Sequence, residues 1–253
     1  GALMFLGCPI RMILRLGGGD LNALFGIAGF AGGIGFGTIF LKKGYSLQRT
    51  YALSKLESAM MPAIQVGLLV LVVTAPAFIF FSQKGPGAMH APWLISLAAG
   101  LVVGGLSQFS RLCTVGGFRD LFLFKKSILI FGYLAVLIGV FVVNISFGNF
   151  HLGFENQPIA HTDGLWNFLG MALAGFCSVL LGGCPLRQLI MTGEGNSDSA
   201  VTVPGLAAGA AFAHNFGLAA SGAGPTLNGE IAVGVGFVVA LIIAILNTKR
   251  ANA

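Results

Sequence analysis

Long uninterrupted apolar segments constrain the fold of this chain more than any other feature. A helix needs about 20 apolar residues to cross a hydrocarbon core about 30 Å thick. Only 9% of the residues are charged, against about 25% in a soluble domain. Because the apolar runs do not alternate with polar residues, they do not fit a membrane β-barrel. We therefore predict an all-α integral membrane protein, a multi-pass bundle with spans at residues 21–41, 60–81, 93–109, 127–147, 165–182, 201–220 and 231–247.

The charged residues lie mostly in the connections between these segments. Residues 110–126 carry four cations and one carboxylate, whereas residues 148–164 carry Glu155 and Asp163 and no Lys or Arg. Since cationic connections usually stay in the cytoplasm, we expect 110–126 inside and 148–164 outside. No basic patch is interleaved with exposed aromatic residues, so nucleic acid is not an expected partner. The expected surroundings are a lipid bilayer.

Two nearly identical loops, GCPIRMILRLGGG at 7–19 and GGCPLRQLIMTGEG at 182–195, indicate an internal duplication. The offset between Cys8 and Cys184 is 176 residues (184 minus 8), and it carries Gly29, Gly33 and Gly37 onto Gly205, Gly209 and Ala213. We place the repeat elements at about 1–41 and 165–220, within a single transmembrane domain over residues 1–253. A full crossing by 21–41 puts the two loops on opposite sides of the membrane, and a re-entrant 21–41 puts them on one side.

Each repeated loop contains the residues that break a helix. Proline lacks a backbone donor and resists continuation of a helix, and glycine relaxes the backbone beside it. The sequence therefore predicts broken or re-entrant helices around a central constriction, since irregular backbone at membrane depth must line a cavity or be buried. The helix ends formed in this way direct N–H groups at an anion. The loop-backbone residues concerned are Gly7, Pro9, Gly183 and Pro185.

Cys8 and Cys184 are the first candidates for a site, since a thiol recurs at matching points of both loops. Cys113 is a third candidate because Arg111 and Arg119 flank it, and nearby cations activate a thiol and attract anions. Each of these cysteines has packing as its alternative role. Cys177 has no partner in the repeat, and we expect it to pack. The four cysteines form neither a disulfide framework nor a C-x-x-C pair, and no metal site is expected.

Four arginines near these cysteines are candidates either for attracting an anion or for a structural role, because a cation facing lipid is costly. They are Arg11, Arg111, Arg119 and Arg187. The chain contains neither a nucleotide-binding motif nor a recognisable arrangement of hydrolase residues. We therefore expect no catalytic residues, no cofactor and no enzymatic activity.

At GCPIR (7–11), SRLCTVGGFRD (110–120) and GGCPLRQLIMTGEGN (182–196), the chain resembles the YeeE/YedE family of sulfur-compound membrane transporters, and most closely its selenium-metabolism branch. The resemblance implies an hourglass-shaped protein of the bacterial inner membrane, with a substrate path along Cys8, Cys113 and Cys184. It also implies a further cysteine motif ahead of the first loop. That motif is absent here, so we expect the chain to lack its N-terminal portion.

The expected function is transport of a small sulfur- or selenium-containing inorganic species, most simply an anion, along these thiols. A small cytoplasmic thiol-carrying protein would be a compatible partner. The alternatives are a membrane-bound sulfur or selenium transferase, with an adduct on Cys113 or Cys184, and a structural subunit whose cysteines only pack. The sequence leaves the substrate, the energy coupling and the oligomeric state open.

Overall fold

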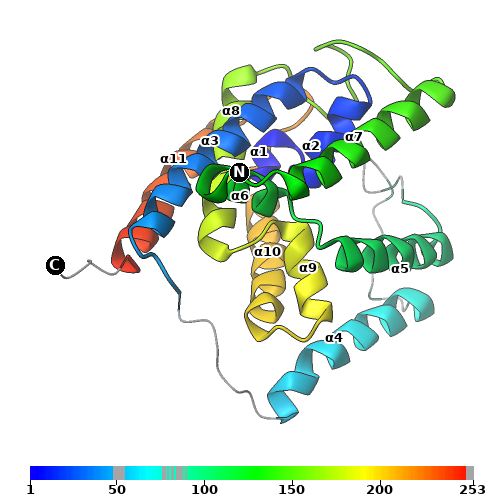
Figure 1. Cartoon of the computed structure of the whole chain (residues 1–253). Coiled ribbons are helices and arrows are strands. Elements are labelled where there is room, and N and C mark those ends of the chain that lie inside the picture. The colour runs from blue at the N-terminus through cyan, green and yellow to red at the C-terminus, as the bar shows by residue number, and fades with distance from the viewer. Residues whose placement is uncertain are drawn as a thin grey trace. The chain divides into compact units, whose positions relative to one another are not determined.

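The computed structural model describes residues 1–47, 55–75 and 90–248, together with 78, 80, 83 and 88, and these residues form only helices and connections (Figure 1). The prediction of an all-α protein is confirmed for this part of the chain. The helices are α1 Ala2–Phe5, α2 Pro9–Gly17, α3 Asn22–Lys42, α4 Lys55–Thr74, α5 Trp93–Ser110, α6 Thr114–Phe124, α7 Ile128–Ser146, α8 Gly164–Leu181, α9 Pro185–Gly193, α10 Ser197–Asn215 and α11 Leu227–Leu246.

Five segments among the described residues are long and apolar enough to cross a membrane. Three are single helices, α3, α7 and α11, and two join a long helix to the short one after it, α5 with α6 and α8 with α9. Two predicted spans differ. The described apolar part of α4 is shorter, Ala59–Thr74, and α10 is not among the five. Small and polar residues in α10, such as Ser197, Asp198 and His214, lower its hydropathy below that of a clear span.

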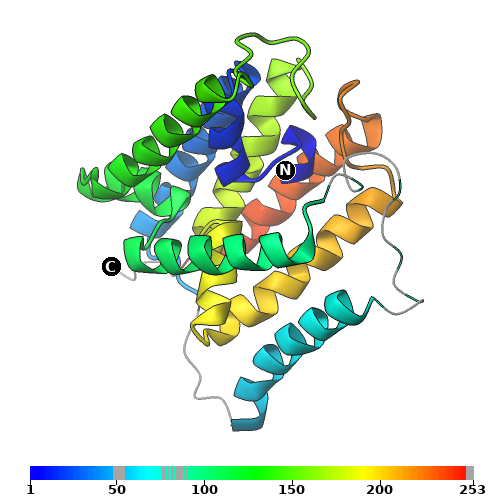
Figure 2. The same ribbon diagram turned by 90° about the vertical axis from the view of Figure 1, so that its right-hand side faces the viewer.

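The chain divides into two compact units. The first contains Gly1–Gln48, Leu112–Arg187 and Pro204–Ala253, and the second contains Arg49–Arg111 and Gln188–Val203. In the first unit α8 is the central helix, since it packs along α3 and also contacts α1, α6 and α11. Of the span formed by α8 and α9, 61% is buried, against 6% for α7. Helices α3 and α8 are neighbours in both views (Figures 1 and 2).

Close packing between α3 and α8 depends on glycine. A Cβ added at Gly29 would collide with the carbonyl oxygen of Phe168, and one added at Gly33 would collide with that of Ala172. In return, Gly175 of α8 lies against the backbone of Phe30. Small residues let two helices approach in lipid, where no hydrophobic effect drives them together. The predicted stripe of small residues on α3 is therefore a packing surface.

The second unit contains α4, α5 and the segment joining α9 to α10. Asn196 caps α10, since its Oδ1 accepts a hydrogen bond from the Ser199 N–H at 2.9 Å. The Ser199 hydroxyl donates to Gln188 Oε1 at 2.7 Å, so this polar pair is satisfied although both residues are buried.

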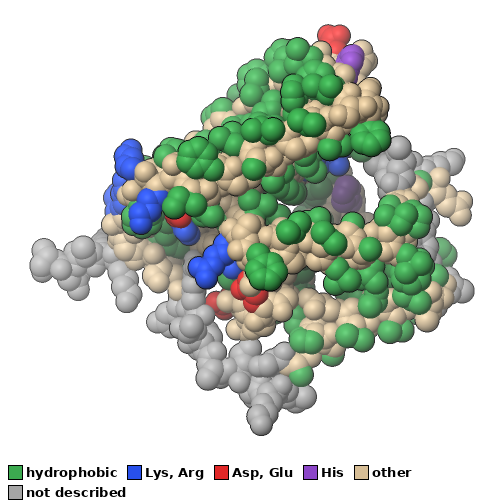
Figure 3. Space-filling view, turned by 45° about the vertical axis from the view of Figure 1, so that its right-hand side comes forward, with side chains coloured by type: hydrophobic (Ala, Val, Ile, Leu, Met, Phe, Trp, Pro, Cys, Tyr) green, Lys and Arg blue, Asp and Glu red, His purple; other side chains and the backbone are tan. Residues whose placement is uncertain are grey.

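Large apolar side chains cover the outward surfaces of the long helices (Figure 3). Exposed examples are Leu101 on α5, Phe131 on α7 and Ile242 on α11. A soluble monomer rarely exposes large contiguous apolar areas. These surfaces fit a hydrocarbon environment.

Candidate functional site

The two Cys-Pro loops begin with the same C-terminal helix cap. At the end of α1, Leu6 is left-handed with φ 61°, and the Gly7 N–H donates to the Ala2 carbonyl at 2.9 Å. At the end of α8, Gly182 is left-handed with φ 89°, and the Gly183 N–H donates to the Ser178 carbonyl at 3.0 Å. This pattern is a Schellman motif. The residue that turns the chain is thus one position earlier than the glycine predicted from the sequence.

Each of the three predicted path cysteines immediately precedes a short helix: Cys8 before α2, Cys113 before α6 and Cys184 before α9. Proline is the first residue of both α2 and α9, where its missing N–H costs nothing. Two sulfurs act as N-caps. The Gly116 N–H donates to Cys113 Sγ at 3.3 Å, and the Arg187 N–H donates to Cys184. Cys8 makes no such bond. All three thiols thus lie where helix N–H groups create a positive potential.

The structure brings Cys113 and Cys184 together. Their side chains interact directly, and Thr114 also lies beside Cys184. The Tyr133 hydroxyl lies within electrostatic range of both Cys8 and Cys184, and it donates to the Pro9 carbonyl at 3.1 Å. Tyr133 is itself fixed by an edge-to-face contact with Phe118 of α6. The three cysteines, separated by up to 176 residues in the sequence, therefore converge around one tyrosine.

Replacing Tyr133 by phenylalanine should lower the free energy of unfolding by about 1 kcal/mol, because the Pro9 carbonyl loses a buried hydrogen-bond donor. Denaturant titration in detergent measures this change. Tyr45→Phe is the matched variant, since the buried Tyr45 hydroxyl donates to the Leu180 carbonyl at 3.2 Å away from the thiols. A Tyr133→Phe protein as stable as the unmodified one would contradict the hydrogen bond.

The three thiols differ in exposure. Cys184 is 2% exposed, and Cys8 and Cys113 are half-buried. Cys8 lines an apolar cavity of about 560 Å³ whose wall also contains Pro185, Cys177 and small residues of α10. The prediction that Cys177 packs is wrong, because Cys177 is exposed on the face of α8 that borders this cavity. A thiol at the cavity wall thus leads toward a thiol pair inside the protein.

The four predicted arginines have different surroundings. Arg119 forms an ion pair with Asp120, in which its Nη2 lies 2.9 Å from Oδ1, and this supports the structural alternative. Arg111 ends α5 in the second unit, with an exposed side chain. Arg187 contributes its backbone N–H to Cys184. Arg11 folds against the first loop, where a Cβ on Gly7 would lie 2.8 Å from Arg11 Cδ.

Sequence reasoning missed Arg15 and Asp20. Arg15 is 7% exposed, and its Nε donates to Asp20 Oδ2 at 2.6 Å. The pair is not repeated, since Met191 and Asn196 occupy the positions equivalent to Arg15 and Asp20, and a search for repeated chemistry therefore passes over it. The spacing of Arg11 and Arg15, four residues apart on one helical face, was the available signal.

No cluster of three metal-ligating side chains occurs among the described residues. Comparisons with known protein families, with curated proteins and with solved structures found no match. The class of protein therefore follows from the helices themselves. Five helical segments of membrane-spanning length and an apolar exterior fit a multi-pass membrane protein.

Proposed function

We propose that this protein is a membrane transporter or channel for a small sulfur- or selenium-containing inorganic species, passed along the thiols of Cys8, Cys113 and Cys184. The observation that carries the proposal is the convergence of these three cysteines around Tyr133. The resemblance to the YeeE/YedE family supports the substrate class and a location in the bacterial inner membrane. A soluble thiol-carrying partner at the cytoplasmic side is compatible with it.

The chemistry of the thiols fits such a substrate. Sulfur is soft and polarizable, and the S–H group is a weak donor. It can therefore contact a sulfur or selenium atom without holding it so tightly that release is prevented. The interior position of Cys184 matters as well, because electrostatic attraction is much stronger in a dry constriction than in water. The N-termini of α6 and α9 add positive potential at the thiol pair.

We also propose that the loops are halves of an internal duplication. The bounds of α2, Pro9–Gly17, and of α9, Pro185–Gly193, differ by the same 176 residues as Cys8 and Cys184. The left-handed residues Leu6 and Gly182 differ by 176 too, as do Gly19 and Gly195. Many transporters place their substrate site between repeats, at discontinuous helices.

Uptake of labelled thiosulfate, selenite and selenide into proteoliposomes holding the full chain tests the proposal, with protein-free liposomes as the control. We expect saturable uptake of at least one of the three. Uptake of none of them would reject it. If the protein instead retains label covalently on Cys113 or Cys184 without filling the vesicles, it is a sulfur or selenium transferase.

A further inference from the structure

A polar cavity of about 510 Å³ lies beside the first loop, apart from the apolar cavity that Cys8 lines. One wall is a face of α2, with Arg11, Leu14, Arg15 and Gly18 at helical spacing. The rest comes from Asp20 and Asn144 and from residues of the connection between α7 and α8, namely Asn149, His151, Asn156, Gln157 and Pro158. We call this space the arginine cavity.

The cavity has two buried cationic groups with unused donors. Arg15 Nε and Nη1 are occupied, by Asp20 Oδ2 at 2.6 Å and by the Phe5 carbonyl at 2.5 Å. Arg15 Nη2 and Arg11 Nε are buried and find no acceptor among the described residues. A buried N–H group of a cation without an acceptor is costly. Both groups therefore need an acceptor that the described residues do not supply.

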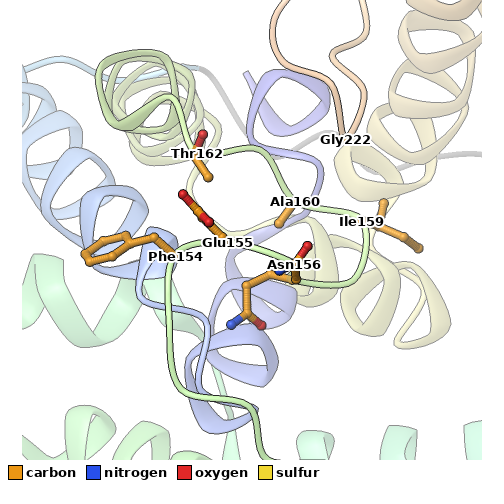
Figure 4. A pocket seen from close by; sticks show the side chains of 8 residues that line it. Phe154, Glu155, Asn156, Ile159, Ala160, Thr162 and Gly222 are labelled. Carbon is orange, nitrogen blue, oxygen red and sulfur yellow. The ribbon is translucent and has the colours of Figure 1, made fainter.

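The charges that face the cavity are unequal. Asp20 contributes one carboxylate, and that carboxylate is committed, with Oδ2 to Arg15 and Oδ1 to the Asn22 backbone and side-chain N–H groups at 2.9 Å. Arg11 remains as an excess cation. The nearest acid of the connection, Glu155, is not on this wall. It faces the neighbouring cavity of about 450 Å³, where Figure 4 shows it turned away from Asn156, which borders both.

The wall opposite α2 is held in place. The His151 N–H donates to the Gly18 carbonyl at 2.9 Å, and the Gly153 N–H donates to the Gly19 carbonyl at 3.0 Å. A Cβ at Gly19 would collide with the His151 carbonyl, and φ at Gly19 is +99°, so this close approach requires glycine. Gln157 Nε2 fixes the connection further by donating to the His151 carbonyl at 2.8 Å. The site is therefore built before any ligand arrives.

We propose that the arginine cavity binds a small inorganic anion through Arg11 and Arg15. A volume of about 510 Å³ accommodates a tetrahedral oxyanion with several waters, each of which occupies about 30 Å³ in the liquid. Guanidinium N–H groups suit oxyanions because they present parallel donors. Since a helix rises about 1.5 Å per residue, Arg15 and Arg11 lie about 10 Å and about 5 Å along α2 from Cys8. On the proposed function, the bound anion waits one helical turn from the first thiol.

Isothermal titration of the detergent-solubilised full chain with sodium thiosulfate and sodium sulfate, at constant ionic strength, tests the site. We expect saturable binding of one anion per chain, weakened at least about tenfold by Arg11→Gln. Arg119→Gln is the matched control, since it removes a cation that is paired with Asp120 away from this cavity, and it should leave the affinity unchanged. Absence of saturable binding, or equal effects of the two variants, overturns the proposal.

A second variant guards against misfolding of Arg11→Gln. Asn149 is an exposed residue of the connection, so Asn149→Asp should fold and should repel the anion, whereas Asn149→Ala should bind nearly as before. Equal affinities of these two variants would also overturn the site. Binding by Cys184→Ser separates the two proposals. Retained binding with intact uptake rejects the thiol path alone, and absent binding with Cys184-dependent uptake rejects the arginine cavity alone.

Discussion

Replacing Cys184 by serine should reduce uptake of the transported species by at least about tenfold, an increase of about 1.4 kcal/mol in the barrier. Cys184 is 2% exposed, interacts with Cys113 and accepts the Arg187 N–H. A serine hydroxyl keeps a donor of similar size but loses the soft sulfur, which is the property that the proposed path requires. Initial uptake rates in proteoliposomes measure the effect.

Cys177→Ser is the matched control, because Cys177 lies on α8 seven residues before Cys184 and no motif of the family resemblance includes it. It should transport at nearly the unmodified rate. Melting temperatures of both variants should agree with that of the unmodified protein, so that a loss of flux cannot be assigned to unfolding. Equal uptake by Cys184→Ser and the unmodified protein would show that Cys184 is not on the path.

The sequence predicted the helical class and the three cysteines because their signals are local. An apolar run, a Cys-Pro pair and a repeated loop each act within about one helical turn or span. The structure adds that Cys113 lies against Cys184, which joins residues 71 positions apart (184 minus 113). The spacing in the sequence alone could not give that contact, since it depends on how α6 packs against α8.

The arginine cavity was beyond prediction for a different reason. Arg15 and Asp20 form their ion pair across a turn, and the opposite wall comes from residues 149–158, which are more than 100 positions further along the chain. Nothing in the repeat indicates this wall. Cys177 illustrates the same limit, because its exposure depends on a cavity between α8 and α10 and not on its neighbours in the sequence.

Alanine at Gly33 should lower the free energy of unfolding by about 2 to 3 kcal/mol, which is the usual cost of overpacking an interior. The new Cβ would collide with the carbonyl oxygen of Ala172. Since that oxygen belongs to the backbone, no rotamer change relieves the collision, and α3 and α8 must separate. Because α8 is the central helix of its unit, separation there also disturbs α1, α6 and α11. Thermal unfolding in detergent, followed by tryptophan fluorescence, measures the loss.

Gly209→Ala tests whether the loss comes from packing or from the glycine itself. Gly209 is the repeat equivalent of Gly33 (33 plus 176), yet a Cβ there meets nothing within 4 Å, because Gly209 lines the apolar cavity. In an open helix position alanine is favoured over glycine by about 0.5 to 1 kcal/mol. Gly209→Ala should therefore match or exceed the stability of the unmodified protein. Equal destabilisation by both substitutions would mean that the two stripes of small residues are packed alike, and the apolar cavity beside Cys8 would then be closed.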